Sequence, residues 1–193
     1  MRSSPQQHRG RIPFASVIIL FLIWEIFMKR LKLYMILGFL FTAVLGTVWH
    51  FLYDWTGRGA IAALFFPVNE STWEHMKLIF FPMLLSSFFL SARFKEEYPC
   101  LPGALLLGDL LGTLSIPVTF YTYKGIVGRS FLAADIAVFL AGVLIAFRTA
   151  WVLKESPAVC QYRNLIYLFT ALSAVLFFIF AFFPPAVGLF AEP

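Results

Sequence analysis

Five long apolar segments dominate the pattern of hydrophobic and polar positions along the chain. They are Leu33 to Leu52, Trp73 to Ala92, Leu101 to Phe120, Phe131 to Ala150, and Asn164 to Phe183. A helix of about 20 residues is roughly 30 Å long, which matches the hydrocarbon core of a bilayer. Polar and apolar residues do not alternate within the segments as they must in a membrane β-barrel. The pattern therefore predicts an all-α, polytopic transmembrane helix bundle with five strong spans.

A further apolar segment, Ile12 to Met28, is shorter and is interrupted by Glu25. It fits a sixth span, an uncleaved signal-like segment, or an extension upstream of an alternative start. If it spans, the basic residues before Ile12 fall on the side of the membrane that the positive-inside rule disfavours. We therefore divide the chain into an N-terminal extension, residues 1–32, where a sixth span stays open, and a helix bundle domain, residues 33–193.

Composition supports the membrane class and limits the kinds of binding partner to expect. Hydrophobic residues make up 61% of the chain and charged residues only 13%, with a mean hydropathy of +0.84. A soluble domain carries about 25% charged residues. The net charge is +5, yet the basic residues flank the apolar segments and form no stripe with interleaved aromatics. We therefore expect the lipid bilayer, and no nucleic acid, as the partner.

Basic residues are unevenly divided between the two ends of the predicted bundle. One end carries Lys29, Arg30, Lys32, Arg93, Lys95, Arg148, Lys154 and Arg163, and the other carries Arg58, Lys124 and Arg129. The positive-inside rule then predicts a cell-membrane protein with the first set in the cytoplasm and the C-terminus outside. Cys100 and Cys160 fall on cytoplasmic loops in this topology, where thiols stay reduced, and their spacing predicts no disulfide framework.

The stretch PVNESTWEHMK, residues 67–77, is unusually polar for its surroundings. Ser71 and Glu74 form a capping box, in which the Ser71 hydroxyl accepts the Glu74 backbone N–H and the Glu74 side chain reaches back to Ser71. Lys77 can pair with Glu74 at i+3. Capping does not account for the remaining polar residues Asn69, Glu70 and His75, which are costly in lipid unless they face protein or water.

Rows of small residues indicate which polar groups face neighbouring helices. Gly38, Thr42 and Gly46 form a row at four-residue spacing that continues to His50 and Asp54. Such rows let helices approach closely, so His50 and Asp54 are predicted to face other helices. They are spaced i, i+4, and two interpretations stay open: a carboxylate that orients an imidazole, or a structural ion pair.

Two more carboxylates lie in or near predicted spans. Asp109 sits beside the Gly108-x-x-x-Gly112 row near the middle of its segment, where a carboxylate must be protonated, paired or in a wet cavity. Asp135 enters the following segment near its start, where the helix dipole favours a negative charge.

Helix ends bring these groups towards one end of the bundle, and we predict a shared polar pocket near the outer membrane face. Its candidate residues are His50, Asp54, Asn69, Glu70, Glu74, His75, Asp109 and Asp135. Histidine and carboxylate ligands suit a metal such as zinc, and His50, His75 and Glu70 are the candidate ligands. No HExxH motif occurs, so the sequence leaves the cofactor and any catalysis unassigned.

The stretches WHFLYDW, residues 49–55, and PVNESTWEHMK resemble a domain-of-unknown-function family of small prokaryotic multi-pass membrane proteins. The VNESTWEH core carries the resemblance, which runs from about Tyr34 to the end of the chain. It implies a fold type and no activity.

Three functions are consistent with these features. The first is an integral membrane protein whose pocket binds or processes a lipid-linked or small substrate. The second is a small transporter or channel subunit that uses Asp109, which for five or six helices implies a homo-oligomer. The third is a structural or accessory membrane protein, in which the polar groups only fix helix packing.

Overall fold

The computed structural model describes the backbone from Phe14 to Glu192 and the side chains from Arg30 to Glu192. Two units, residues 1–34 and 35–193, make up the chain, and both the core and the candidate site belong to the second. The elements are α1 (Phe14–Trp55), α2 (Ala60–Phe65), α3 (Thr72–Phe94), α4 (Leu101–Val127), α5 (Leu132–Leu153), α6 (Pro157–Gln161), α7 (Arg163–Phe180) and the 3-10 helix η1 (Gly188–Phe190). The described residues contain no strand, so the predicted all-α class is confirmed.

Five of these helices are long and apolar enough to cross a membrane, as the hydrophobic pattern predicted. They cover Arg30–Trp55, Thr72–Phe94, Leu101–Val127, Leu132–Leu153 and Arg163–Phe180. The basic cluster before Leu33 does not separate two helices, because α1 runs unbroken from Phe14 to Trp55. The side chains of the Ile12 to Met28 segment lie outside the described residues.

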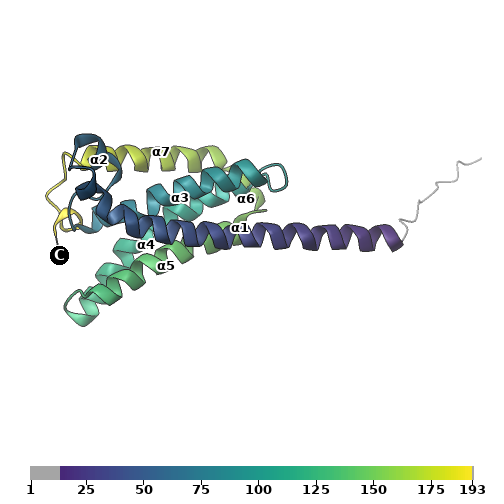
Figure 1. Cartoon of the computed structure of the whole chain (residues 1–193), viewed down its shortest axis with the longest axis horizontal. Helices are drawn as coiled ribbons and strands as arrows, with labels where there is room; N and C mark the ends of the chain where they lie inside the picture. The colour runs from purple at the N-terminus through teal and green to yellow at the C-terminus, as the bar shows by residue number, and fades with distance from the viewer. Residues whose placement is uncertain (1–13, 193) are drawn as a thin grey trace, which may run out of the picture. The chain divides into compact units, whose positions relative to one another are not determined.

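Helices α3 and α4 form the centre of the bundle, and α5 packs along α4 (Figure 1). A Cβ atom built on Gly112 of α4 would lie 2.6 Å from the carbonyl oxygen of Gly142 in α5, and one on Gly108 would collide with the carbonyl of Ala146. Only glycine permits these two backbones to approach so closely. The small-residue row predicted for this segment is therefore a packing surface.

The row on α1 packs in the same manner. The Thr42 and Ser86 hydroxyls are 2.7 Å apart and join α1 to α3. A Cβ atom on Gly46 would meet the carbonyl of Leu78 and the ring of Phe139, at 2.8 Å from the latter. The α1 row thus faces α3 and α5, and it directs His50 towards α3.

Apolar side chains cover much of the outer surface of the helices. Phe88 and Phe89 in α3 are 69% and 62% exposed, and Leu168 and Leu172 in α7 are 53% and 47% exposed. Large apolar groups exposed in mid-helix are expected where lipid, rather than water, surrounds the protein.

The end of α4 differs from the sequence prediction. Helix α4 continues beyond Phe120 to Val127, because the residue that ends it is Gly128, whose φ of 81° is the left-handed conformation of a helix C-cap. Pro117 lies within the helix and does not terminate it. The extension carries Tyr121 and Tyr123 on helical backbone rather than on a loop.

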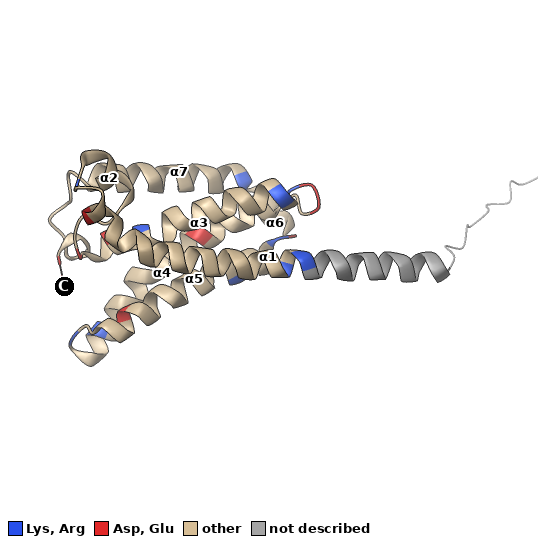
Figure 2. Cartoon of the chain, in the orientation of Figure 1, with Lys and Arg blue, Asp and Glu red and all other residues tan. Residues whose placement is uncertain are grey.

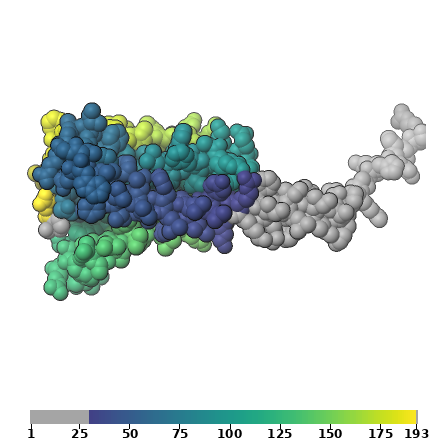
Figure 3. All heavy atoms as spheres, viewed as in Figure 1, coloured from purple at the N-terminus to yellow at the C-terminus, as the bar shows by residue number. Residues whose placement is uncertain are grey.

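The C-terminal tail returns to the bundle. The ring of Phe190 packs on Trp73 with centroids 4.9 Å apart, and the Tyr121 hydroxyl donates to the carbonyl of Gly188 at 2.9 Å. Figure 3 shows the tail, in yellow, at the same end of the bundle as residues 56–70, in dark blue.

Cys100 and Cys160 form a disulfide, so the expectation of two separate thiols is wrong. Cys100 caps α4 and Cys160 lies in α6, and the packing of α6 against α4 brings their Cα atoms within 4.8 Å. That separation suits a disulfide. The two residues are 60 positions apart in sequence, and no local pattern indicates this contact.

Candidate metal centre

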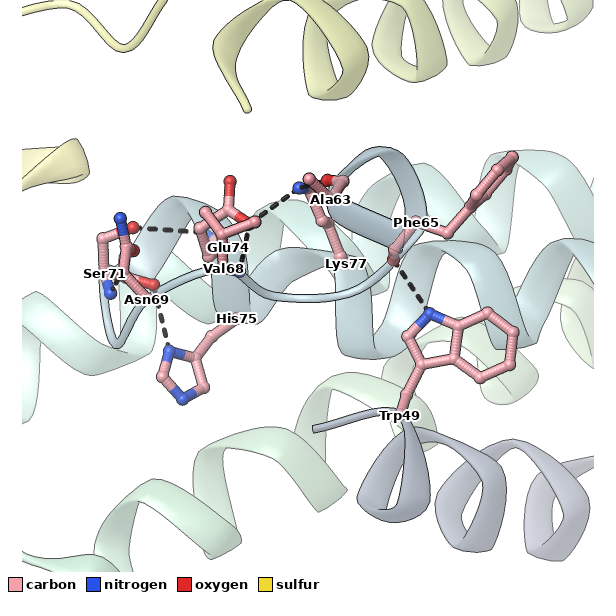
Figure 4. A network of polar contacts seen from close by, with 9 residues as sticks. All are labelled: Trp49, Ala63, Phe65, Val68, Asn69, Ser71, Glu74, His75 and Lys77. Atoms are coloured by element: carbon pink, nitrogen blue, oxygen red, sulfur yellow. Dashed lines mark hydrogen bonds and ion pairs between the residues drawn. The ribbon is translucent and has the colours of Figure 1, made fainter. Parts of the chain in front are cut away.

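Residues 67–77 begin α3 with half of the predicted capping box. The Ser71 hydroxyl accepts the Glu74 backbone N–H at 3.4 Å, as expected. The Glu74 side chain does not reach back to Ser71; the Asn69 side-chain oxygen accepts the Ser71 N–H instead, at 3.0 Å (Figure 4). Asn69 therefore has the capping role that the sequence assigned to Glu74.

Glu74 is turned into the protein core, where it pairs with Lys77. The Lys77 ammonium donates to Glu74 Oε2 at 2.7 Å and to the carbonyl of Ala63 at 3.0 Å. Glu74 Oε2 also accepts the backbone N–H of Val68 at 3.0 Å. The pair is buried, with Lys77 0% and Glu74 2% exposed. It ties α2 and the following loop to α3, and so it fixes the loop that carries Glu70.

His50, Glu70 and His75 come together at the ends of α1, the loop and α3. His75 Nε2 is 3.3 Å from Glu70 Oε2, and His50 Nε2 is 3.8 Å from Glu70 Oε1. One potential ligand atom from each residue lies within 4.8 Å of the others. Ligand atoms bound to a tetrahedral zinc ion at about 2.0–2.1 Å lie roughly 3.3 Å from one another. The three side chains therefore have nearly the spacing of a metal site.

The backbone of Ser71 selects one tautomer of His75. His75 Nδ1 is 3.0 Å from the Ser71 carbonyl oxygen, which can only accept, so Nδ1 carries the proton. In the neutral ring the lone pair is then on Nε2, which faces the Glu70 carboxylate. Two acceptors at this separation can share a cation such as a metal ion. A carbonyl that fixes the tautomer of a histidine ligand in this way is common in metal sites.

A cavity of about 170 Å³ lies on one side of this cluster. Its polar lining is His50, Glu70, Thr72, His75 and Asp135, and its apolar lining is Leu78, Ile116, Phe120, Leu132, Val138 and Phe139. A second hollow, of about 390 Å³, adjoins it and shares His50 and Glu70 with the first. The cluster thus borders an apolar cavity and a polar one.

Asp135 reaches the apolar cavity from the first turn of α5. Its Oδ1 accepts a hydrogen bond from the Tyr123 hydroxyl, which α4 supplies because that helix extends past Phe120. Asp135 is therefore held by a neighbouring helix in the same cavity as the His50, Glu70 and His75 cluster.

The remaining candidates lie elsewhere. Asp54 lines the polar hollow and does not orient His50, because it binds Arg58 Nε at 2.7 Å; this hydrogen bond raises the pKa of the Arg58 guanidinium. Asp109 is fully buried and lines neither cavity. Thr113 donates to its Oδ1 at 3.3 Å, and Oδ2 has no hydrogen-bond partner among the described residues.

Sequence reasoning missed several residues around the site. Tyr53 and Arg58 line the polar hollow, and Thr72 joins the cavity wall. Arg58 follows Asp54 at i+4 and comes directly after Gly57, so the turn it occupies was detectable. The apolar wall of the cavity was not detectable from the sequence, since its residues come from three different helices.

Five membrane-length helices and outward-facing apolar side chains identify a multi-pass membrane protein of the helix-bundle class. A family model described as a family of unknown function (DUF6512) matches residues 22–193, and the chain belongs to that family. The match extends upstream of Tyr34, so our expectation of where the resemblance begins was too narrow. No curated protein and no solved structure matches the chain.

Proposed function

We propose that this protein is a metal-dependent hydrolase of the membrane, with one zinc ion bound by His50, Glu70 and His75. The observation that carries the proposal is the convergence of three ligand atoms within 4.8 Å. Two histidines and a glutamate are a ligand set of catalytic zinc sites, in which the fourth position stays open for water. Zinc lowers the pKa of such a water to about 7, which produces a nucleophile at neutral pH.

Asp135 is the proposed general base. It lines the same cavity as the three ligands, and a carboxylate in that place can take a proton from the attacking water. The Tyr123 hydroxyl, which donates to Asp135 Oδ1, holds the carboxylate in position. Asp109 has no part in this proposal because it lines neither cavity.

Zinc binding provides the direct test. The full-length protein, purified in detergent and dialysed after incubation with zinc, is expected to retain one zinc ion per chain by elemental analysis. Glu70→Gln is expected to weaken zinc binding by more than about 100-fold, because loss of an outer-shell partner alone costs 10- to 100-fold. Glu96→Gln is the matched control, since Glu96 is exposed on the loop between α3 and α4.

The two variants also separate a binding defect from a folding defect. Glu70→Gln should melt at the same temperature as the wild type when zinc is absent, and should lose only the stabilisation that zinc adds. Wild-type protein that retains no zinc contradicts the proposal, as does an equal loss of zinc in both variants.

We further propose that the chain lies in the cell membrane of a prokaryote with the candidate site and the C-terminus outside. Most described basic residues of the second unit lie at the end of α3 and α7 that is remote from the tail (Figure 2). This charge bias favours a cytoplasmic position for that end. The disulfide lies at the same end and favours the opposite compartment. We base the orientation on the charge bias, because it acts while the chain is inserted into the membrane. Disulfides do occur in cytosolic proteins, although they are rare there.

Reporter fusions test this orientation. Fusions after Lys95 and after Glu155 should report the cytoplasm, and a fusion after Arg129 should report the outside. External reporters at Lys95 and Glu155 would reverse the orientation.

A further inference from the structure

The two cavities beside the His50, Glu70 and His75 cluster differ in chemistry and share a wall, which defines a class of substrate. We propose that the protein hydrolyses esters in which a short or branched acyl group is joined to an uncharged, hydroxyl-rich head such as glycerol. This inference rests on the proposed metal function and adds the substrate class to it.

The apolar cavity suits the acyl group. Apart from its polar rim it is lined by aliphatic and aromatic side chains from α3, α4 and α5. Its volume of about 170 Å³ is close to that of engineered apolar cavities of about 150 Å³, which bind benzene. An apolar group of about six carbon atoms therefore fits, and a long acyl chain does not fit within it.

The polar hollow suits a neutral head. The Tyr53 hydroxyl and the Asn69 side-chain amide can donate hydrogen bonds there, and Asp54 can accept them. The Arg58 side chain is paired with the Asp54 carboxylate. Because Arg58 is already paired with Asp54, the hollow offers no free arginine for an anionic head. Mixed donors and acceptors match hydroxyl groups, which both donate and accept.

The shared wall locates the reacting bond. His50 and Glu70 line both cavities, so an ester with its acyl group in one and its head in the other has its carbonyl beside the proposed metal ligands. In the reaction the oxygen of water bonds to the acyl carbon and the bond from that carbon to the head-group oxygen breaks. One proton of the water passes to Asp135 and then to the departing oxygen. The products are a carboxylic acid and a free alcohol, with no oxidant or reductant needed.

Three hexanoate esters with the same acyl group test the inference. They are glyceryl monohexanoate, methyl hexanoate, which lacks a head, and hexanoyl glycerol phosphate, which has an anionic head. Zinc-loaded, full-length protein is expected to hydrolyse glyceryl monohexanoate with a kcat/KM about tenfold above that for either of the others, since each hydrogen bond to the head contributes about 0.5–1.5 kcal/mol. Release of hexanoate is the measurement, and zinc content is determined in the same samples.

A tyrosine variant connects the preference to the polar hollow. Tyr53→Phe removes one hydroxyl and should lower the ratio of glyceryl to methyl ester activity about two- to tenfold, the value of one hydrogen bond. Tyr162→Phe is the matched control, since Tyr162 is 55% exposed and lies at the other end of the bundle, and it should leave the ratio unchanged.

The outcomes separate the two proposals. Zinc-loaded protein that hydrolyses none of the esters, treats the glyceryl and methyl esters equally, or prefers the phosphate ester overturns the substrate class and leaves the metal site standing. An unchanged activity ratio in Tyr53→Phe also overturns it. Protein that binds no zinc overturns the proposed function and the substrate class together.

Discussion

Replacing Lys77 with methionine is expected to lower the free energy of unfolding by about 3–5 kcal/mol. The substitution leaves the Glu74 carboxylate buried, at 2% exposure, without its ammonium partner at 2.7 Å. It also removes the hydrogen bond from Lys77 to the carbonyl of Ala63 in α2. An uncompensated buried charge is among the most costly defects in a folded protein. The measurement is unfolding by sodium dodecyl sulfate in mixed micelles, followed by circular dichroism.

A second substitution and an exposed lysine make this prediction specific. The double variant Glu74→Gln/Lys77→Met removes both charges and should recover most of the lost stability, since paired replacement of a buried ion pair is often close to neutral. Lys95→Met should change stability by less than about 0.5 kcal/mol, because Lys95 is exposed at the end of α3. A Lys77→Met variant as stable as the Lys95→Met variant would contradict the assigned role of the pair.

The loss of the Glu74–Lys77 pair should also weaken zinc binding at the proposed metal site. Glu74 accepts the N–H of Val68, and the loop from Val68 leads directly to Glu70. We therefore expect weaker zinc binding in Lys77→Met, although Lys77 does not belong to the ligand cluster.

Substituting Gly108 by alanine should destabilise the protein by about 2–3 kcal/mol, the cost of overpacking a close contact. The added methyl group would collide with the backbone carbonyl of Ala146, which cannot rotate away as a side chain can. Helices α4 and α5 would have to separate along the Gly108 and Gly112 row. The same detergent titration measures the effect.

Gly125 provides the matched control in the same helix. No atom lies within 4 Å of a Cβ atom built there, and Gly125 is exposed. Gly125→Ala should therefore stabilise the protein by about 0.5–1 kcal/mol, the usual gain from replacing glycine within a helix. The contrary result, in which both alanine variants stabilise the protein, would show that close helix packing at Gly108 is dispensable.

Much of the fold follows from local sequence features. Segments such as Leu101 to Phe120 are too apolar and too long for anything other than membrane helices, because backbone groups in lipid must bond within the segment. Small-residue rows identified the packing faces of α1 and α4, since only small side chains permit close approach. The end of α4 was misplaced because the apolar segment ends at Phe120, whereas the helix continues to its C-cap at Gly128.

The candidate site could be predicted only in part from the sequence. His50, Glu70 and His75 were chosen because polar groups in such a segment need partners, and the fold brings these three together. Glu74 and Asp109 satisfied the same reasoning, yet one lies in a buried ion pair and the other on α4, away from both cavities. The free-energy cost of exposing a polar group to lipid predicts that protein encloses the group. It does not predict which residues surround it.

The sequence by itself determined the membrane class, the five spans and the faces through which α1 and α4 pack, because each depends on residues within one helix. Only the tertiary structure decided that Cys100 pairs with Cys160, that Asn69 rather than Glu74 accepts the Ser71 N–H, and that Tyr123 holds Asp135. These contacts depend on how far each helix extends and on the rotation of each helix against its neighbours. No pattern within a single segment encodes either quantity, so the partners of polar side chains at the helix ends emerge only when the bundle is assembled.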